Sequence, residues 1–352
     1  MELAVAHYYA RGPERLGPGG DFVTASDAGD AFGDAVAHQL LELDARLGAP
    51  DPFHYLEIGC GRGLLARHVL DGLARRAPRL RQRARCVLAD SSPGMRAAAA
   101  ARVPEAEVVT PEEMPHGVTG CLVAVELFDA LPVHRLRRRG SALREIGVGL
   151  HEGALVEVEM DPAPGPAALA ARYGAAPEEG DEAEVCPALE NVVARMAATL
   201  ARGFVLVVDY GDDAARLYGP HRAAGTLLAY HRHRAHEDLL ARPGQQDLTA
   251  HVNFSHLEDA ATAHGFRPLG RTTQDRFLVT NGILERFTGD QEAWGTPQSV
   301  ARRRAALQLL HPDGMGRRFQ VLFLAKGEAG DEGGELGGLA DPFRGGPGDP
   351  PL

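Results

Sequence analysis

A run of three glycines at alternate positions limits the fold of this chain more than any other feature. Residues 54–65 read HYLEIGCGRGLL, with a short apolar stretch, then Gly59, Gly61 and Gly63, then the start of a helical pattern. Glycine lets the backbone approach a ligand that a side chain would block. The N–H groups at the start of a helix favour polar or anionic atoms. The run therefore predicts a strand, a ligand-binding turn and a helix.

The spacing of these glycines argues against a dinucleotide site. That site needs the pattern G-x-G-x-x-G, and Leu64 occupies the position of its third glycine. What remains is Glu57, two residues ahead of the first of three alternating glycines. We therefore expect the turn to bind a ligand other than NAD.

Strands and helices alternate through the first part of the chain. Apolar spacing predicts strands at residues 55–58, 84–88, 107–109 and 121–125, and helices at 32–47, 64–73 and 95–102. Residues 8–22 are rich in glycine and proline and predict a loop. This alternation implies an α/β fold, with a doubly wound parallel sheet and helices on both faces.

The alternation breaks after residue 140. Residues 143–160 predict a strand pair that turns at Glu152-Gly153, and residues 161–181 predict a polar surface excursion. A helix is expected at 188–200, an apolar strand at 204–208, two more helices at 255–265 and 296–310, and a last strand at 319–324. After Lys326 the chain is rich in Gly, Pro and acids, so we expect residues 327–352 to be disordered and dispensable.

These elements predict a chain of seven parts. They are an N-terminal loop and helix (1–50), a ligand-binding core (51–140), an insertion (141–202), a core strand (203–212), a substrate-side insertion (213–264), C-terminal core elements (265–326) and the tail (327–352).

Charge and cysteine content exclude several classes of protein. The chain has 37 basic and 48 acidic residues, a net charge of −11, so it lacks a global basic footprint for nucleic acid. No apolar run approaches the roughly 18 residues of a membrane helix. Its four cysteines have no metal-binding spacing and resemble the thiols of a reducing compartment. The N-terminus has no signal-peptide pattern, so we expect a cytoplasmic protein without a membrane span or a metal.

Acidic residues follow several of the predicted strands. Asp90 follows the second strand, Glu126 and Asp129 follow the fourth, and Asp209 follows residues 204–208. Ligands of open α/β sheets bind at the carboxyl ends of strands. There Asp90 can accept ribose hydroxyls, while Glu126 and Asp129 can hold a cationic acceptor or take its proton. The alternative for Asp90 is that it is a solvated acid in a loop without a binding role. The alternative for Glu126 and Asp129 is that they lie at the N-terminus of a helix, where the helix dipole favours acids.

Histidines and alternating polar residues mark the second insertion. His231, His233 and His236 lack the helical spacing of zinc ligands, so a surface or substrate-lip role is expected. Residues 247–254 alternate polar and apolar side chains, which predicts one strand face carrying Asp247, Thr249, His251 and Asn253. The alternative is a half-exposed edge strand without a function.

Together these motifs resemble the MidA-type class I S-adenosylmethionine (SAM) methyltransferases, the family of the mitochondrial complex I assembly factor that methylates arginine. The resemblance runs from about residue 1 to 326, and the Glu-x-x-Asp-Ala-x-Pro and Asp-x-Thr segments are its most specific parts. The matching stretches are Tyr8-Tyr9, Gly20-Asp21-Phe22-Val23-Thr24, the glycine run, Glu126-Leu127-Phe128-Asp129-Ala130-Leu131-Pro132, Asp209-Tyr210-Gly211, Gly225-Thr226-Leu227, Asp247-Leu248-Thr249 and Met315-Gly316.

The resemblance implies a Rossmann-like methyltransferase sheet with a second lobe formed by insertions, and SAM as cofactor. The expected cofactor-binding residues are Asp21, Thr24, Glu57, Gly59, Gly61, Gly63, Asp90 and Ser91. The implied acceptor is arginine of a protein substrate, such as a respiratory-complex subunit. Glu126 and Asp129 are the first catalytic candidates, followed by Asp209 and His251. A SAM-binding assembly factor without catalysis and a small-molecule methyltransferase remain as alternatives.

Several positions depart from the family pattern. Cys60 replaces a proline in the glycine run, and Val125 replaces an asparagine, so a contact near the cofactor is lost. Ser26, Asp27 and Gly29 replace proline, glutamate and serine. The chain begins within the family's first helix, so either the start lies upstream of Met1 or that helix is shortened. These changes bear on activity more than on fold.

Overall fold

The protein is described by a computed structural model that covers residues 1–10, 12, 17, 24–27, 29–176, 178–285, 296–329 and 334–342. The chain forms two compact units, which are described separately. The larger unit contains residues 23–125, 196–208 and 265–352, and the smaller unit contains residues 1–22, 126–195 and 209–264. The change from the larger to the smaller unit therefore falls after Val125, earlier than the expected end of the core at residue 140.

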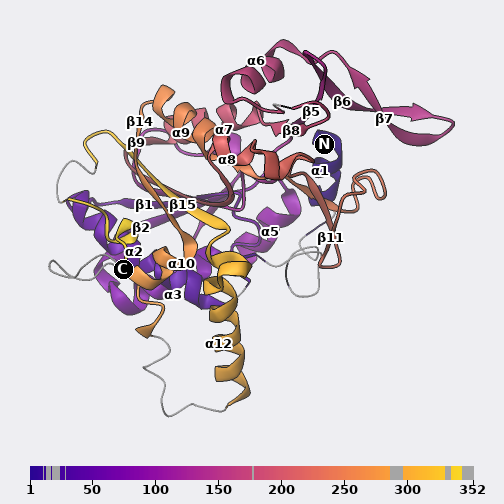
Figure 1. Ribbon diagram of the computed structural model, residues 1–352. Helices are drawn as coiled ribbons and strands as arrows, with labels where there is room; N and C mark the ends of the chain where they lie inside the picture. Colours follow the sequence, from indigo (N-terminus) through magenta and orange to yellow (C-terminus); the bar gives the residue numbers. More distant parts are fainter. Residues whose placement is uncertain are drawn as a thin grey trace, which may run out of the picture. The chain divides into compact units, whose positions relative to one another are not determined.

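The larger unit is built on a mostly parallel sheet with the strand order β14-β15-β9-β4-β1-β2-β3 (Figure 1). Neighbours from β9 to β3 pair in parallel, and β14 is antiparallel to β15. This order confirms the doubly wound α/β class. The strands are β1 (Phe53–Ile58), β2 (Ala84–Ala89), β3 (Glu107–Val109), β4 (Val118–Val125), β9 (Leu200–Asp212), β14 (Phe266–Thr273) and β15 (Phe319–Lys326).

Helices cover this sheet, and two of them, α2 and α3, are in close contact at a glycine of each helix. A Cβ atom at Gly33 would lie 2.3 Å from the Cβ of His68, and one at Gly72 would lie 2.7 Å from the Cβ of Ala37. Helices α2 and α3 can therefore approach closely only because both positions are glycine. The helices are α2 (Asp30–Arg46), α3 (Leu64–Arg76), α4 (Pro78–Arg83), α5 (Pro93–Arg102), η2 (Pro111–Glu113), α10 (Gln274–Thr280), α12 (Pro297–Leu310), η5 (Pro312–Gly316) and η6 (Gly337–Leu339).

Residues 334–342 differ from the expected disordered tail. The two terminal nitrogens of Arg46 donate to the carbonyl oxygens of Gly334 and Glu335, each at 2.8 Å. The N–H of Gly337 donates to the Glu42 carboxylate at 3.0 Å, and Leu336 is buried. The expectation rested on average composition, which a single buried leucine hardly changes. Residues 330–333 and 343–352 lie outside the described part of the chain.

The smaller unit contains two antiparallel sheets, with strand orders β7-β6-β5-β8 and β11-β10-β12. The short strand β13 pairs in parallel with residues Gly211 and Asp212 at the end of β9. The strands are β5 (His134–Arg139), β6 (Ala142–His151), β7 (Ala154–Met160), β8 (Glu182–Val185), β10 (Leu228–His231), β11 (Arg234–His236), β12 (Asp247–Thr249) and β13 (Val252–Asn253). The helices are α1 (Glu2–Ala10), α6 (Pro164–Tyr173), α7 (Ala188–Thr199, which runs into the larger unit), α8 (Ala214–Leu217), η3 (Pro220–Arg222) and α9 (Phe254–Ala263).

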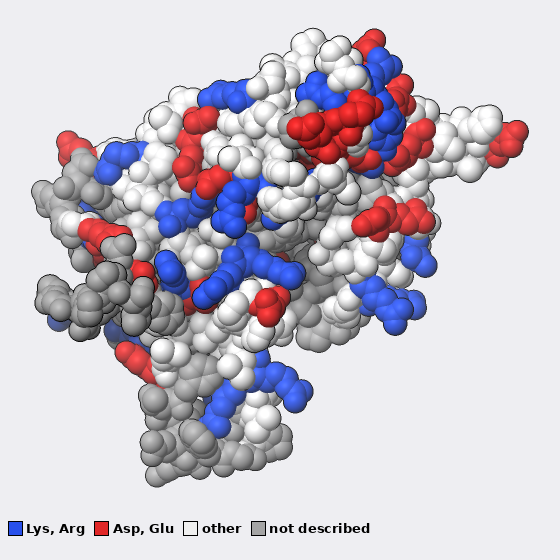
Figure 2. Space-filling view, viewed as in Figure 1, with Lys and Arg blue, Asp and Glu red and all other residues white. Residues whose placement is uncertain are grey.

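One face of the four-stranded sheet carries ion pairs between arginine and glutamate side chains of different strands. Arg137 of β5 contacts Glu159 of β7 at 2.8 Å, and Arg135 contacts Glu182 of β8 at 2.8 Å. Figure 2 shows acidic and basic side chains interleaved at the upper right, where Figure 1 labels β5, β6 and β8. Leu136, which alternates with these arginines along β5, is buried in an apolar cluster. Alternation along the strand thus gives the sheet one charged and one apolar face.

Three sequence-based expectations differ from the structure of this unit. Tyr8 and Tyr9 lie in helix α1, where a loop was expected, and residues 164–173 of the expected polar excursion form helix α6. The segment 247–254 is not one strand: β12 pairs with β10, and β13 pairs with β9. β12 lies at the edge of its sheet, as the alternative reading expected, but Asp247 and Thr249 are buried rather than half-exposed.

Candidate active site

The glycine turn links β1 to helix α3 in the larger unit. Gly59, Gly61 and Gly63 have φ angles of 74°, 51° and 68°, a left-handed region that side chains disfavour. A Cβ atom at Gly63 would lie 3.1 Å from the Cα of Ala99 in α5. The left-handed backbone therefore favours glycine at these three positions, and at Gly63 a side chain would also crowd α5.

Asp90, directly after β2, is linked to this turn by a hydrogen bond. Its Oδ2 atom accepts from the N–H of Gly61 at 2.9 Å, and its Oδ1 atom accepts from the N–H of Ser92 at 2.8 Å. Burial raises the pKa of Asp90. Each oxygen keeps a further lone pair that a ligand hydroxyl can use. Ser91 is exposed, and its carbonyl oxygen accepts from Arg96 at 2.9 Å.

Thr24 belongs to a tight turn that is linked to the glycine turn by an ion pair. The Thr24 hydroxyl donates to Oδ2 of Asp27 at 3.0 Å, and Oδ1 of Asp27 pairs with Arg62. The Asp27 side chain is 4% exposed, so this is a largely buried pair. Sequence reasoning treated Asp27 as a departure from the family pattern, although an arginine within the glycine run was a signal that it needed an acidic partner. Asp21 lies outside the described residues.

Glu57 is buried in β1, just before the glycine turn. It accepts a hydrogen bond from the hydroxyl of Tyr55 in the same strand. Burial raises the pKa of Glu57 to about 8, so the side chain is mostly neutral at pH 7. The structure therefore places Glu57 beneath the turn as a hydrogen-bonded acid rather than as a surface charge.

A second group of acids follows β4 and lies in the smaller unit. The β4–β9 ladder ends at the pair Val125 and Val208, so Glu126 and Asp209 are the next residues of the two strands. Asp209 is fully buried, and its Oδ2 atom accepts from the N–H groups of Leu127, Phe128 and Asp129 at 3.2, 2.9 and 3.3 Å. Burial and the nearby Asp129 raise the pKa of Asp209. Asp209 thus holds the turn in place, and Glu126 within it adopts a left-handed φ of 51°.

Asp129 lies at the end of this turn and is only 5% exposed. The hydroxyl of Tyr210 and the backbone N–H groups of Ala130 and of Asp129 itself donate to its carboxylate. Within the described part of the chain, its buried Oδ1 atom has no hydrogen-bond partner. Burial raises the pKa of Asp129 to about 6, so the group is mostly ionised at pH 7.

Two residues that sequence reasoning did not assign to the site join Asp129. Asp247 of β12 accepts from the hydroxyl of Tyr9 in α1, and Asp129 and Asp247 both lie close enough to raise the pKa of Tyr9. Thr249 hydrogen-bonds to Tyr210. The signals in the sequence were the Asp-x-Thr segment and the polar–apolar alternation of residues 247–254, and neither carries information about what these residues contact.

His251 lies beside this group, and its ring already contacts two neighbouring side chains. Its Nδ1 atom accepts from Arg222, and its ring packs edge-on against Tyr210 with centroids 5.1 Å apart. An arginine donor at Nδ1 leaves that nitrogen unable to take a proton. The structure therefore brings His251 to the site but limits its use as a base.

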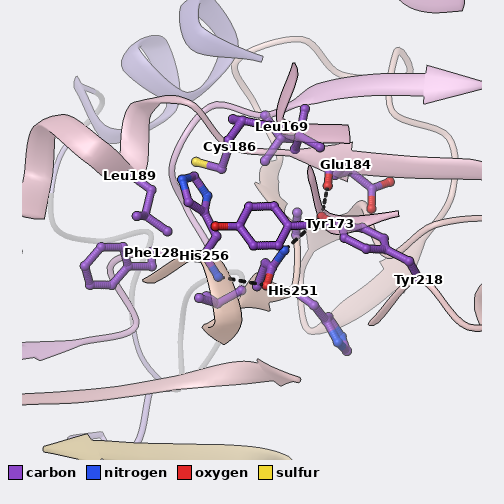
Figure 3. Close-up of a pocket in the computed structure, with 14 residues that line it drawn as sticks. Phe128, Leu169, Tyr173, Glu184, Cys186, Leu189, Tyr218, His251 and His256 are labelled. Atoms are coloured by element: carbon purple, nitrogen blue, oxygen red, sulfur yellow. Dashed lines mark hydrogen bonds between the residues drawn. The ribbon is translucent and has the colours of Figure 1, made fainter. Parts of the chain in front are cut away.

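His251 also lines a narrow pocket of the smaller unit (Figure 3). The pocket is also lined by Tyr173, Tyr218 and His256, and each of these side chains is hydrogen-bonded to a neighbouring residue. The Tyr218 hydroxyl donates to the carbonyl of Glu184 at 2.9 Å, and the Tyr173 hydroxyl donates to Asp259 at 2.8 Å. The Glu184 carboxylate accepts from the N–H and the hydroxyl of Thr226, each at 2.8 Å. These satisfied groups make the pocket a weaker candidate for ligand binding than Asp129.

The described residues contain neither a cluster of metal ligands nor a membrane-spanning helix. No group of three or more His, Cys, Asp and Glu side chains in them could hold a metal ion. None of the described helices combines the length and apolar character needed to cross a membrane.

A mostly parallel sheet in this order, with β14 antiparallel at its edge, a glycine turn after β1 and an acid after β2, is typical of the class of SAM-dependent methyltransferases. The turn and Asp90 fit an adenosyl ligand, since three glycines carry no side chains that would block it and each Asp90 oxygen keeps a lone pair for a ribose hydroxyl. The sequence profile of the Methyltransf_28 family of S-adenosyl-L-methionine-dependent methyltransferases matches residues 35–272, more than half of the chain. The chain belongs to this family.

Individual relatives agree with this assignment. The chain is 26% identical over 346 residues to mouse protein arginine methyltransferase NDUFAF7, covering 90% of this chain and 77% of the relative. The human protein of the same name is 27% identical, with 88% and 75% covered. A solved structure from Burkholderia thailandensis, bound to S-adenosyl-homocysteine, is 29% identical with a TM-score of 0.84, covering 95% of this chain and 86% of that one. The protein is a SAM-dependent methyltransferase, and SAM is its cofactor.

Proposed function

We propose that the enzyme transfers the methyl group to an arginine side chain of a protein substrate. The observation that carries this proposal is Asp129, a buried and mostly ionised carboxylate whose Oδ1 atom has no hydrogen-bond partner in the described residues. A buried anion is costly unless a cation or donors accompany it. Guanidinium supplies both, as a planar cation with five N–H groups. The names of the curated relatives point to the same acceptor.

The cofactor residues proposed for this reaction lie around the glycine turn. Gly59, Gly61 and Gly63 give the ligand access to the backbone, Asp90 accepts the ribose hydroxyls, and the Asp27–Arg62 pair fixes the turn. Glu57, Ser91, Asp21 and Thr24 remain proposed members of the same site. SAM, when bound, supplies a methyl group on a positively charged sulfur.

Asp129 would orient the acceptor and take its proton. Bound guanidinium is a poor nucleophile, so an enzyme must position it and accept a proton as the new bond forms. The guanidino nitrogen bonds to the methyl carbon while the carbon–sulfur bond breaks, and that electron pair stays on sulfur. The proton leaving the nitrogen passes to the Asp129 carboxylate. Glu126 is a second candidate for this role, and Asp209 acts by holding the turn.

The test is incubation of the pure protein with methyl-labelled SAM and lysate of its host, followed by analysis of labelled protein for methylarginine. Wild type should form methylarginine, and Asp129→Asn should not. Label on a small molecule would replace the proposal with a small-molecule methyltransferase. No label with intact SAM binding would support an assembly factor. Identification of the labelled protein would test whether it is a respiratory-complex subunit.

We also propose that the protein works in a reducing compartment such as the cytoplasm. Cys60, Cys86, Cys121 and Cys186 are all free thiols, which supports this proposal. The curated relatives carry the word mitochondrial in their names. Fractionation of host cells, with detection of the protein in each fraction, is the direct measurement.

A further inference from the structure

We propose that Asp129 and Asp247 together form a two-carboxylate site for the guanidinium of the acceptor, with Tyr9 and Tyr210 holding the two acids in place. The proposal rests on the proposed function and goes further by naming Asp247, rather than Glu126, as the partner of Asp129. It also gives helix α1 a part in acceptor binding.

The two acids come from distant segments that meet inside the smaller unit. The N–H of Ala250, directly after β12, donates to the carbonyl oxygen of Asp129 at 3.0 Å. This bond fixes the end of β12 against the turn that follows β4. Tyr9 contributes a hydroxyl to Asp247 and lies near Asp129 as well. Four segments of the chain therefore converge on one pair of carboxylates.

Burial makes this pair unfavourable without a ligand. Asp247 is 1% exposed and Asp129 is 5% exposed. Two carboxylates near each other in a buried place oppose each other's ionisation. The Oδ1 atom of Asp129 is buried and accepts no hydrogen bond from any described residue. A cation placed between the acids would relieve both costs.

The neighbouring acids do not fit this role as well. Oδ2 of Asp209 already accepts from three backbone N–H groups, and Oδ1 accepts from the N–H of Tyr210 at 2.9 Å. Glu126 is partly exposed, so water can solvate its charge. A metal is a poor occupant, since the described residues offer no group of three ligands. Guanidinium matches two carboxylates through N–H groups on its separate edges.

Binding of a small probe tests the pair directly. The protein, saturated with S-adenosyl-homocysteine, is titrated with n-butylguanidinium and, separately, with its neutral analogue n-butylurea and with n-butylammonium. Wild type should bind n-butylguanidinium at least tenfold more tightly than either of the others. Asp129→Asn and Asp247→Asn should each weaken n-butylguanidinium at least tenfold. The control is Asp161→Asn in the same unit, where the side chain is 89% exposed, and it should bind as wild type does.

Folding of each variant is checked by its affinity for S-adenosyl-homocysteine and its melting temperature. If Asp247→Asn fails to fold, Tyr9→Phe keeps the ring and removes the hydroxyl that holds Asp247, and should weaken the probe severalfold. Wild-type affinity for n-butylguanidinium in a folded Asp247→Asn would overturn the pair, even if the enzyme methylates arginine. Weakened n-butylguanidinium binding in both Asp129→Asn and Asp247→Asn would support the two-carboxylate site. If wild type nevertheless forms no methylarginine, the proposed activity would be overturned while the site stands. Equal affinity for n-butylammonium would overturn guanidinium as the ligand.

Discussion

The carboxylate of Asp209 lies 2.9 Å from the backbone nitrogen of Phe128, 81 positions earlier in the chain. Phe128 is the middle of three consecutive N–H donors to the same oxygen. The sequence made Asp209 a catalytic candidate because it ends a buried strand. Its hydrogen bonds give it a positioning role, since a carboxylate that fixes three N–H groups sets the path of the turn carrying Glu126 and Asp129.

Removal of this acceptor should destabilise the protein. Asp209→Ala leaves four backbone N–H groups without this acceptor, three in the turn after β4 and that of Tyr210, and one unsatisfied buried group costs about 1–3 kcal/mol. We expect the free energy of unfolding to fall by about 2–4 kcal/mol, measured by urea denaturation. Asp161→Ala, at an exposed position of the same unit, should change little. An unchanged unfolding curve for Asp209→Ala would show that the turn does not depend on this side chain.

Methyl transfer should depend on pH through Asp129. A base must be deprotonated, and burial raises the pKa of Asp129 to about 6. The value of kcat/KM should therefore be flat above pH 7 and fall about tenfold per unit well below pH 6. Asp209 lies close to Asp129, so the measured value belongs to the pair. A profile that is flat from pH 5 to 8 would remove Asp129 as the proton acceptor.

Asp90 should matter for cofactor affinity. Asp90→Asn keeps the size of the side chain and removes its charge, and hydrogen bonds to charged groups contribute about 1.5–3 kcal/mol. We expect S-adenosyl-homocysteine to bind about tenfold or more weakly in calorimetric titration. Glu107→Gln, at an exposed position of the same unit, is the control. Equal affinities in wild type and Asp90→Asn would exclude a contact with the ribose.

The Asp27–Arg62 pair should also support cofactor binding. Asp27→Ala leaves a largely buried guanidinium without its partner and frees the glycine turn. S-adenosyl-homocysteine affinity should fall about tenfold, in the range of a lost charged hydrogen bond. Asp27→Glu restores the charge and should recover most of the affinity. If Ala and Glu variants behave alike, the charge at this position plays no part in binding.

The C-terminal segment should contribute to stability. Truncation after Lys326 removes the buried Leu336 and the contacts with Arg46 and Glu42. Burial of one leucine side chain contributes about 1.5–3 kcal/mol, so the free energy of unfolding should fall by about that amount. A chain ending at residue 342 keeps these contacts and is the matched control. Equal stability of the two truncated chains would restore the original expectation of a dispensable tail.

The parallel sheet could be predicted because its signals are local. Each strand from β1 to β4 is a short apolar run, and the glycine turn marks the passage from β1 to α3 within a few residues. Strand pairing then follows from the right-handed, parallel connections that such alternation requires. The fold class could therefore be predicted from the sequence alone. The sequence also predicted that Asp90, Glu126 and Asp209 lie at the carboxyl ends of parallel strands.

The contacts of the second acidic group could not be predicted in the same way. Asp247 lies 118 positions after Asp129, and Tyr9 was expected in a loop because glycine and proline follow it closely. The split of residues 247–254 into β12 and β13 depends on which strand each half pairs with. Alternation shows which side chains share a face, but partner strands decide whether that face is buried.

The interleaved segments of the larger unit have a consequence for its biosynthesis. Arg46 and Gly334 are 288 positions apart, and ribosomes add about 5–20 residues per second. About 15–60 s therefore pass between the synthesis of Arg46 in helix α2 and the synthesis of Gly334, which it contacts. During that time β4 lacks β9, and β9 in turn lacks β15. The nascent chain must therefore carry unpaired apolar strands until β15 has been synthesised, so the sheet of this unit cannot be completed before residue 326 is added.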